Sequence, residues 1–169
     1  MKPILSGGQL QLTIQRLCHQ LIESHYPFAD TVIIGLQPRG ILLAEKMVAQ
    51  IKAAYPEIQL DYGQLDITFY RDDTHRQIHI ANETRLNFSI ENRNVILIDD
   101  VLYTGRTIRA AMDALIDFGR PAKVELCVLV DRRFNRQLPI QPDYTGKAID
   151  SFLSQKVTVD WSAGQVLLH

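Results

Sequence analysis

The chain of 169 residues contains no apolar stretch that approaches the ~20 residues needed for a membrane-spanning helix. Its first residues also lack the apolar core of a signal peptide. There are only 2 cysteines, Cys18 and Cys127, and neither stands at metal-ligand spacing from a partner. Because both lie in segments with an apolar pattern, we expect buried, reduced thiols in a cytoplasmic protein.

Neither sign of charge is in excess, since 18 Lys and Arg stand against 19 Asp and Glu, a formal net charge of −1. Sequence-independent binding of nucleic acid depends on a basic excess, so the composition argues against it while leaving room for a local basic face. Internal repeats and low-complexity segments are absent as well. The length and the 46% of hydrophobic residues predict a single domain over residues 1–169, large enough to bury a core.

Residues 94–107, NVILIDDVLYTGRT, form the most informative stretch. Residues 95–98 are a short, β-branched run bounded by polar residues, which predicts a strand buried on both faces. Two carboxylates follow at the end of this strand, Asp99 and Asp100. A glycine-containing turn comes next, and then a helical pattern begins; the turn consists of Tyr103, Thr104, Gly105, Arg106 and Thr107.

This order of features predicts a site for a phosphorylated sugar. A helix start offers free backbone N–H groups and a positive dipole end to a phosphate, and the hydroxyls of Thr104 and Thr107 can donate to it. Gly105 lets the backbone approach closely. Adjacent carboxylates suit the vicinal hydroxyls of a ribose or a hydrated divalent cation. An acidic pair or a Thr-Gly turn alone is more typical of an ordinary strand end, but together they favour a ribose 5-phosphate site.

Residues 95–107 resemble the phosphoribosyl pyrophosphate (PRPP) signature of the type I phosphoribosyltransferases. The form DDVLYTGRT is similar to that of the pyrimidine-operon attenuation regulators that also act as uracil phosphoribosyltransferases. The resemblance implies that Asp99 and Asp100 are catalytic and hold the ribose, while residues 103–107 cradle the 5-phosphate. It implies Mg²⁺ as cofactor, bound through the substrate, with Asp99 and Asp100 as the candidates for direct contact. It further implies PRPP, uracil and UMP as ligands and a homo-oligomer, dimeric or larger.

A second strand-to-helix turn lies between a predicted strand at 31–35 and a predicted helix at 41–51. It is either a simple connection or a second anion site. It resembles the family pattern G-I-K-T-R-G, which implies a pyrophosphate loop made of Pro38, Arg39 and Gly40. Pro38 replaces the threonine of that pattern, so an N–H and a hydroxyl are lost there. A cis Gln37–Pro38 bond costs only ~0.5–1 kcal/mol, and the sequence leaves its isomer open.

Residues 60–70 predict another strand, followed by a polar stretch from 71 to about 93 that is long for a passive connection. Residues 65–73 resemble the pattern L-D-I-T-x-Y-R-D-D. In the family this region is a flexible loop that closes over PRPP and excludes water. The resemblance assigns Arg71 to that closure.

The last third of the chain carries the expected base site. Residues 123–130 predict a strand, and residues 131–147 read as irregular and basic. They resemble D-R-G-H-R-E-L-P followed by D-Y-x-G-K, although Arg133, Phe134 and Asn135 replace the Gly-His pair. The resemblance implies that Arg132 and the backbone near Val157 lie by the uracil. Strands at 157–160 and 166–168 are expected to form a hood.

Residues 9–24 predict an amphipathic helix whose polar face includes Arg16 and His19. This is either a solvated face or, by resemblance, part of a surface that binds the leader RNA of a pyrimidine operon. Three residues further along the chain would extend that surface: Arg132, Arg136 and Lys147. Against this, Ser24 stands where the resemblance expects an arginine.

The alternation of strands and helices predicts an α/β fold, a doubly wound central parallel sheet flanked by helices, with a small C-terminal hood and a flexible loop. The candidate sites all follow strands, and ligands of such sheets bind beyond the carboxyl ends of the strands. We therefore predict a uracil phosphoribosyltransferase that also responds to UMP as an RNA-binding regulator. The alternatives are a purine (hypoxanthine or guanine) phosphoribosyltransferase and an RNA-binding regulator without significant catalysis.

Overall fold

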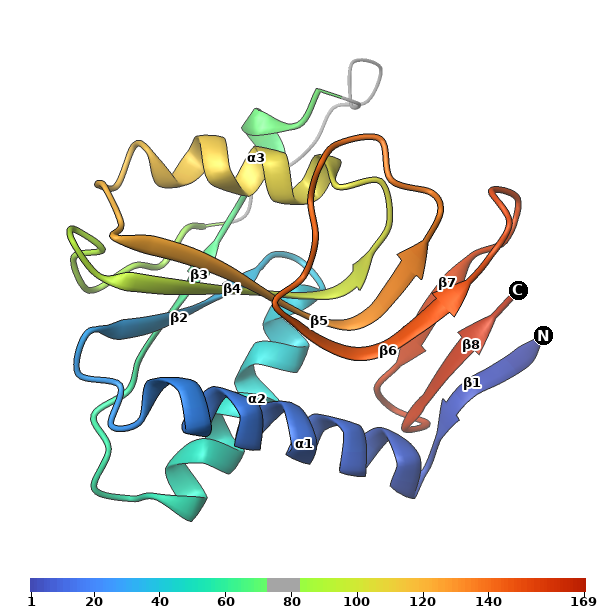
Figure 1. Ribbon diagram of the computed structural model, residues 1–169, viewed down its shortest axis with the longest axis horizontal. Helices are drawn as coiled ribbons and strands as arrows, with labels where there is room; N and C mark the ends of the chain where they lie inside the picture. Colours follow the sequence, from blue (N-terminus) through green and yellow to red (C-terminus); the bar gives the residue numbers. More distant parts are fainter. Residues whose placement is uncertain (73–82) are drawn as a thin grey trace.

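The computed structural model describes residues 1–72 and 83–169 (Figure 1). The flexible loop predicted from residue 71 to about 93 therefore lies partly outside the described residues. The centre of the molecule is a five-stranded parallel sheet of order β3-β2-β4-β5-β6. Its strands are β2 (Thr31–Leu36), β3 (Asp61–Leu65), β4 (Asn94–Leu102), β5 (Lys123–Arg133) and β6 (Tyr144–Asp150).

Helices cover both faces of this sheet. α1 (Gly8–His25) and α2 (Gly40–Ala54) pack on one face, and α3 (Arg106–Leu115) packs on the other (Figure 1). All six residues of β2 are buried, as expected for a strand that is covered on both sides. The predicted doubly wound α/β fold is therefore confirmed.

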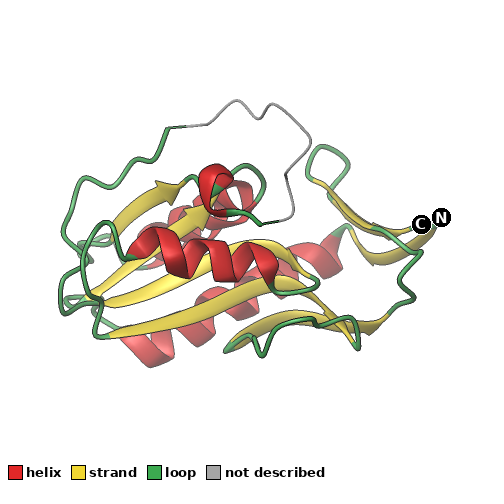
Figure 2. Ribbon diagram, turned by 90° about the horizontal axis from the view of Figure 1, so that it is seen from above, coloured by secondary structure: helices red, strands yellow, loops and turns green. Residues whose placement is uncertain are grey.

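A smaller antiparallel sheet, the hood, lies beyond the carboxyl ends of the central strands (Figure 1). Its order is β1-β8-β7, made of β1 (Lys2–Ser6), β8 (Gln165–Leu168) and β7 (Val157–Asp160). The two termini therefore lie side by side (Figure 2). The prediction of a purely C-terminal hood was incomplete, because β1 contributes from the other end of the chain. Of its five residues only Leu5 is buried, so β1 has no alternating pattern by which a strand is recognised.

Two further boundaries differ from the prediction. The strand predicted at 60–70 ends at Leu65, and a short 3-10 helix, η1 (Thr68–Tyr70), follows it. Asp66 Oδ1 accepts hydrogen bonds from the Thr68 N–H (3.0 Å) and the Thr68 hydroxyl (2.6 Å), a local turn that competes with a sheet ladder.

The segment 131–147 is not irregular throughout, as was predicted. β5 continues to Arg133, and β6 begins at Tyr144 as an edge strand parallel to β5. β6 is at most half-buried and contains Gly146 and Lys147, so its composition does not indicate a strand.

Both cysteines are buried thiols, as expected. Burial raises the pKa of the Cys18 thiol to about 12. Within residues 1–72 and 83–169, no helix combines the length and the apolar character needed to cross a membrane.

Candidate active site

The turn at residues 103–107 connects β4 to α3 and opens on a cavity of about 570 Å³. Gly105 has a φ of 94°, a left-handed conformation that side chains rarely adopt. This turn aims the start of α3, with its free N–H groups, at the cavity. Arg39, Asp99, Arg132 and Val157 line the same cavity. The structure therefore brings together residues that are up to about 120 positions apart in the chain, as expected for loops that follow parallel strands.

The two carboxylates at the end of β4 are both buried, with Asp99 8% and Asp100 2% exposed. Asp99 Oδ1 accepts a hydrogen bond from the Asp100 N–H at 2.9 Å, and Asp100 Oδ1 accepts one from the Val101 N–H at 2.8 Å. Asp99 lines the cavity, whereas Asp100 lies behind it with Oδ2 3.5 Å from Arg39 Nε. Burial, and then the negative charge of Asp100, raise the pKa of the Asp99 carboxyl well above its usual range, against the opposing effects of the hydrogen bond from the Asp100 N–H and of Arg39.

The raised pKa of Asp99 predicts a stability effect with a definite sign. The folded protein holds the Asp99 proton more tightly than the unfolded chain, so stability falls as the pH rises from the unfolded pKa, 3.8, through the folded one. Metal-free Asp99→Asn should therefore be more stable than the parent near neutral pH, and this gain should vanish below about pH 3. Thermal unfolding of parent and variant near neutral pH and below about pH 3 measures this gain in stability. Asp30→Asn, at an exposed position, is the control, and an equal gain at both pH values would contradict the prediction.

The predicted pyrophosphate loop lies beside the carboxylates. The Gln37–Pro38 peptide bond is cis, which answers the question that the sequence left open. A side chain at Gly40 would place its Cβ 2.5 Å from the Ile98 carbonyl oxygen, so only glycine allows the loop to pack this closely against β4. The Arg39 side chain is 62% exposed and is thus available to a ligand.

Arg71 and Arg106 are tied to neighbouring elements. Arg71 Nη1 donates to Thr107 Oγ1 at 3.1 Å. Arg106 Nη1 donates to Asp72 Oδ2 at 2.8 Å, and its Nε donates to Gln137 Oε1 at 2.7 Å. In this arrangement the Arg106 guanidinium braces the turn, and the backbone of residues 104–107 remains the part of the turn best placed to receive a phosphate.

Arg132, predicted to lie by the uracil, is a buried link between the turn and the connection from β6 to β7. It is 5% exposed, and its guanidinium lies 3.9 Å from the centre of the Tyr103 ring. Its Nε donates to Ser151 Oγ at 2.9 Å, and its Nη2 donates to the carbonyl oxygens of Phe152 (3.0 Å) and Gln155 (2.8 Å). Tyr103 thus contacts Arg132 through its ring. Arg132 borders the cavity mainly by holding residues 151–155 in place.

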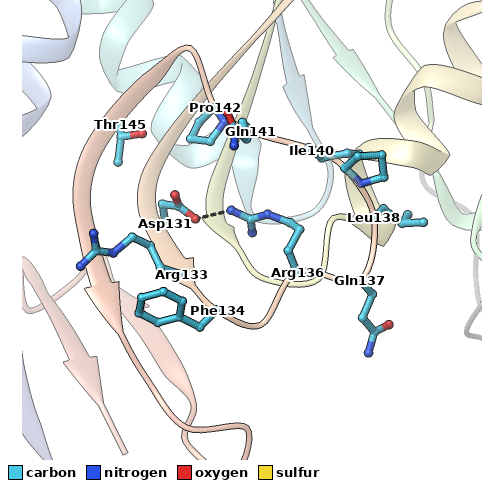
Figure 3. Close-up of a pocket in the computed structure, with 11 residues that line it drawn as sticks. Asp131, Arg133, Phe134, Arg136, Gln137, Leu138, Ile140, Gln141, Pro142 and Thr145 are labelled. Atoms are coloured by element: carbon cyan, nitrogen blue, oxygen red, sulfur yellow. Dashed lines mark hydrogen bonds and ion pairs between the residues drawn. The ribbon is translucent and has the colours of Figure 1, made fainter.

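A second cavity, of about 990 Å³, lies under the connection from β5 to β6 (Figure 3). Arg136 forms an ion pair with Asp131 (2.6 Å) in this cavity and also donates to the Tyr103 carbonyl oxygen (2.6 Å). Phe134 lies on the rim and is 82% exposed. None of the predicted PRPP-binding residues lines this larger cavity, so cavity size alone does not locate the candidate site.

The predicted RNA-binding residues are only partly brought together. Arg16 Nη2 donates to the carbonyl oxygens of Thr145 (3.1 Å) and Gly146 (2.5 Å), which places it beside Lys147. His19 is exposed on the same helix and lines a separate hollow between α1 and α2. Arg132 and Arg136 do not extend an exposed patch, because the first is buried and the second is held by Asp131.

Sequence analysis assigned no role to several residues that line the candidate site: Gln37, Gln137, Leu153, Gln155 and Lys156. Most of them lie in segments without periodicity, and they reach the cavity only because the hood and the β5–β6 connection fold over it. For Gln37 there was a signal, since a glutamine directly follows the buried apolar strand at residues 31–36.

Comparison with known proteins agrees with this geometry. The phosphoribosyl transferase domain family matches residues 2–163. The chain is 46% identical over 160 residues to the bifunctional protein PyrR of Actinobacillus pleuropneumoniae serotype 5b (strain L20), which covers 94% of this chain and 88% of the relative. It is 43% identical over 162 residues to the bifunctional protein PyrR of Ligilactobacillus salivarius (strain UCC118), covering 94% and 90%.

Among solved structures, the fold is similar to that of a hypoxanthine phosphoribosyltransferase from Staphylococcus aureus. The TM-score is 0.74 at 20% identity, covering 98% of this chain and 90% of the other. At this identity the likeness concerns the fold alone. The family match and the curated relatives establish that the chain belongs to the phosphoribosyl transferase family, among the proteins named bifunctional protein PyrR.

Proposed function

We propose that the chain transfers the 5-phosphoribosyl group of PRPP to uracil, which gives UMP and pyrophosphate. The observation that carries this proposal is that one cavity is lined by Asp99, by the turn at the start of α3 and by Arg39 of the second loop. These groups match the ribose hydroxyls, the 5-phosphate and the pyrophosphate of one PRPP molecule. A cavity of about 570 Å³ is also of the size typical for a small-molecule site.

The residues act by position and electrostatics, and no nucleophile from the protein is required. The backbone of residues 104–107 holds the 5-phosphate, and Arg39 attracts the pyrophosphate as it leaves with the electron pair of its bond to the sugar. Asp99, backed by Asp100, holds the ribose hydroxyls and stabilises the positive charge that develops on the ring. Uracil N1 then forms the new bond to the sugar carbon and loses its proton.

The residues present fit Mg²⁺ bound through the substrate. Within residues 1–72 and 83–169 there is no group of three or more His, Cys, Asp or Glu side chains that could hold a metal by themselves. Asp99 and Asp100 offer carboxylate oxygens, the ligand type that Mg²⁺ prefers, and Mg²⁺ usually binds proteins through one or two carboxylates plus substrate phosphates. When bound, the ion would neutralise charge on the pyrophosphate.

The choice of uracil as the base rests on the relationship to PyrR proteins, because the groups that match PRPP are the same under the purine alternative. The test is a panel of nucleobases with PRPP and Mg²⁺, in which pyrophosphate release is measured. We expect release with uracil. Release with hypoxanthine or guanine, and none with uracil, would replace the proposal by the purine alternative.

A second function, binding of the chain's own leader RNA when UMP is present, is favoured by one observation. Arg16 of α1 contacts the backbone of β6 one residue before Lys147, and both basic residues are exposed although they come from distant segments. RNA loops are recognised through stacked and hydrogen-bonded bases as well as through phosphates. A small patch on a chain with net charge −1 is therefore compatible with specific binding.

Arg16→Ala should weaken binding of the leader RNA while leaving uracil transfer unchanged. Loss of one phosphate contact lowers the salt dependence of binding by about one unit of the slope of log K against log salt. Gel shifts at two salt concentrations, with and without UMP, measure both effects. Lys52→Ala, on the exposed part of α2, is the control. Equal binding of a scrambled RNA would leave the transferase as the only function.

A further inference from the structure

Gln37 lies in the second strand-to-helix turn, where the pattern G-I-K-T-R-G has a lysine, and sequence analysis gave it no role of its own. It follows β2 directly, precedes Pro38 and Arg39 of the pyrophosphate loop, and is only 9% exposed. A buried carboxamide carries two donors and an acceptor, and each of them costs free energy if it is left without a partner.

The donors of Gln37 are used across the edge of the sheet. Nε2 donates to the Glu83 carbonyl oxygen at 2.7 Å and to Gln64 Oε1 at 3.2 Å. Gln64 in turn donates through Nε2 to Glu45 Oε1 at 3.1 Å. The orientation of the Gln37 amide follows from these partners, because exchanging its oxygen and nitrogen would place an acceptor against two acceptors.

The acceptor of Gln37 has no partner. Among residues 1–72 and 83–169, no group donates to Gln37 Oε1, and it is the buried side-chain atom of that part of the chain left in this state. A buried acceptor without a donor is unfavourable and needs an explanation. The cost is offset here because the two donor contacts hold Gln37 in this orientation.

The contacts of Gln37 connect three segments. Its backbone N–H donates to the Leu65 carbonyl oxygen at 3.0 Å, which joins it to β3. Residues 83–85 run along β3, where Gln64 and Arg85 exchange backbone hydrogen bonds of 2.9 and 2.8 Å. Gln37 therefore touches both the strand and the segment that lies beside it.

We propose that Gln37 is a positioning residue that ties the pyrophosphate loop to residues 83–85, so that occupancy of the loop stabilises that segment. The inference rests on the proposed function, since it requires pyrophosphate to bind at Arg39. Reciprocally, residues 83–85 hold Gln37 and with it the loop in the form that binds pyrophosphate. Hydrogen bonds from the amide nitrogen transmit the effect, and the unpaired oxygen plays no part in it.

The test combines calorimetry of pyrophosphate binding in the presence of Mg²⁺ with hydrogen exchange of the Arg85 amide. In the parent protein, pyrophosphate should bind and should slow exchange at Arg85. Gln37→Leu removes both donors at similar volume, so pyrophosphate should bind about tenfold more weakly. At saturation it should no longer slow exchange at Arg85. Gln59→Leu, the same change at an exposed position, should behave as the parent.

A second variant keeps the inference testable if Gln37→Leu fails to fold. Gln37→Lys supplies donors for both acceptors and removes the unpaired oxygen, and it restores the lysine of the pattern G-I-K-T-R-G. It should retain the slowing of exchange at Arg85. Slowing in Gln37→Leu equal to that in the parent, or its loss in folded Gln37→Lys, would overturn the inference.

The inference and the proposed function fail in different ways. If pyrophosphate does not bind the parent protein, the proposed function fails and the inference fails with it. If pyrophosphate binds the parent but leaves exchange at Arg85 unchanged, only the inference is overturned. Arg39→Ala separates the binding of pyrophosphate from the link between Gln37 and residues 83–85. It should weaken pyrophosphate binding while leaving exchange at Arg85 in the unliganded protein unchanged.

Discussion

Asp100→Asn should lower kcat/KM for uracil transfer by about 10²–10³-fold, the size expected when one electrostatic contact to the transition state is removed. Asp100 supplies negative charge behind Asp99 and faces Arg39 at 3.5 Å. Asparagine has the same shape and can still accept from the Val101 N–H, but it carries no charge. The loss should therefore appear in the rate, measured as pyrophosphate release at saturating and limiting PRPP.

The fold should survive this change, and the reason lies in the burial of the site. Asp100 is 2% exposed, so replacement by alanine would leave the Val101 N–H without its acceptor. A loss of activity in that variant could then come from lower stability instead of from the missing charge. Asparagine avoids this and also removes the repulsion between the two carboxylates. Circular dichroism and thermal unfolding of the variant serve as the control. Activity within about threefold of the parent would exclude Asp100 from the catalytic machinery.

Arg132→Met should both destabilise the protein and raise the KM for uracil by about tenfold or more. Methionine fills much of the volume but donates nothing, so Ser151 Oγ and the carbonyl oxygens of Phe152 and Gln155 lose their donor. Each acceptor left without a partner costs about 1–3 kcal/mol, a large fraction of a typical stability of about 5–15 kcal/mol. Residues 151–155 would then no longer be fixed above the cavity.

The neighbouring Arg133 provides a matched control. Its guanidinium pairs with Asp150 at 2.8 Å, and both side chains are more than half exposed, 52% and 57%. Exposed ion pairs are worth about 0–1 kcal/mol, so Arg133→Met should change neither unfolding nor KM measurably. The stability and the KM of Arg132→Lys should lie between those of the parent and those of Arg132→Met, because an ammonium cannot reproduce the fork of the guanidinium. Equal effects of Arg132→Met and Arg133→Met would contradict the linking role.

Local patterns were sufficient wherever a residue's neighbours in the chain decide its structure. The apolar run at 95–98 predicted a buried strand, and β4 is one. Gly105 was expected in the turn, and its left-handed φ of 94° lies directly before α3. The carboxylates and the turn follow one strand, so their arrangement at its carboxyl end was predictable from the parallel α/β pattern.

Local patterns were insufficient for edge elements and for side chains with long-range partners. β1 and β6 are poorly buried, and each forms a strand because another strand offers it backbone partners, β8 for β1 and β5 for β6. Arg132 was predicted to lie by the uracil. Its observed position depends on acceptors about 20 residues further along the chain, in the connection from β6 to β7.

The sequence by itself determined the α/β fold class and the position of the carboxylates and of the turn at residues 103–107 at the end of one strand. It did so because hydrophobic periodicity and glycine conformation act over a few residues. Only the tertiary structure decided that Asp99 and not Asp100 lines the cavity, that Arg132 holds residues 151–155, and that Gln37 spans the sheet edge to Glu83. These three depend on burial and on hydrogen-bond partners that are brought close in space by packing, and no local pattern encodes them.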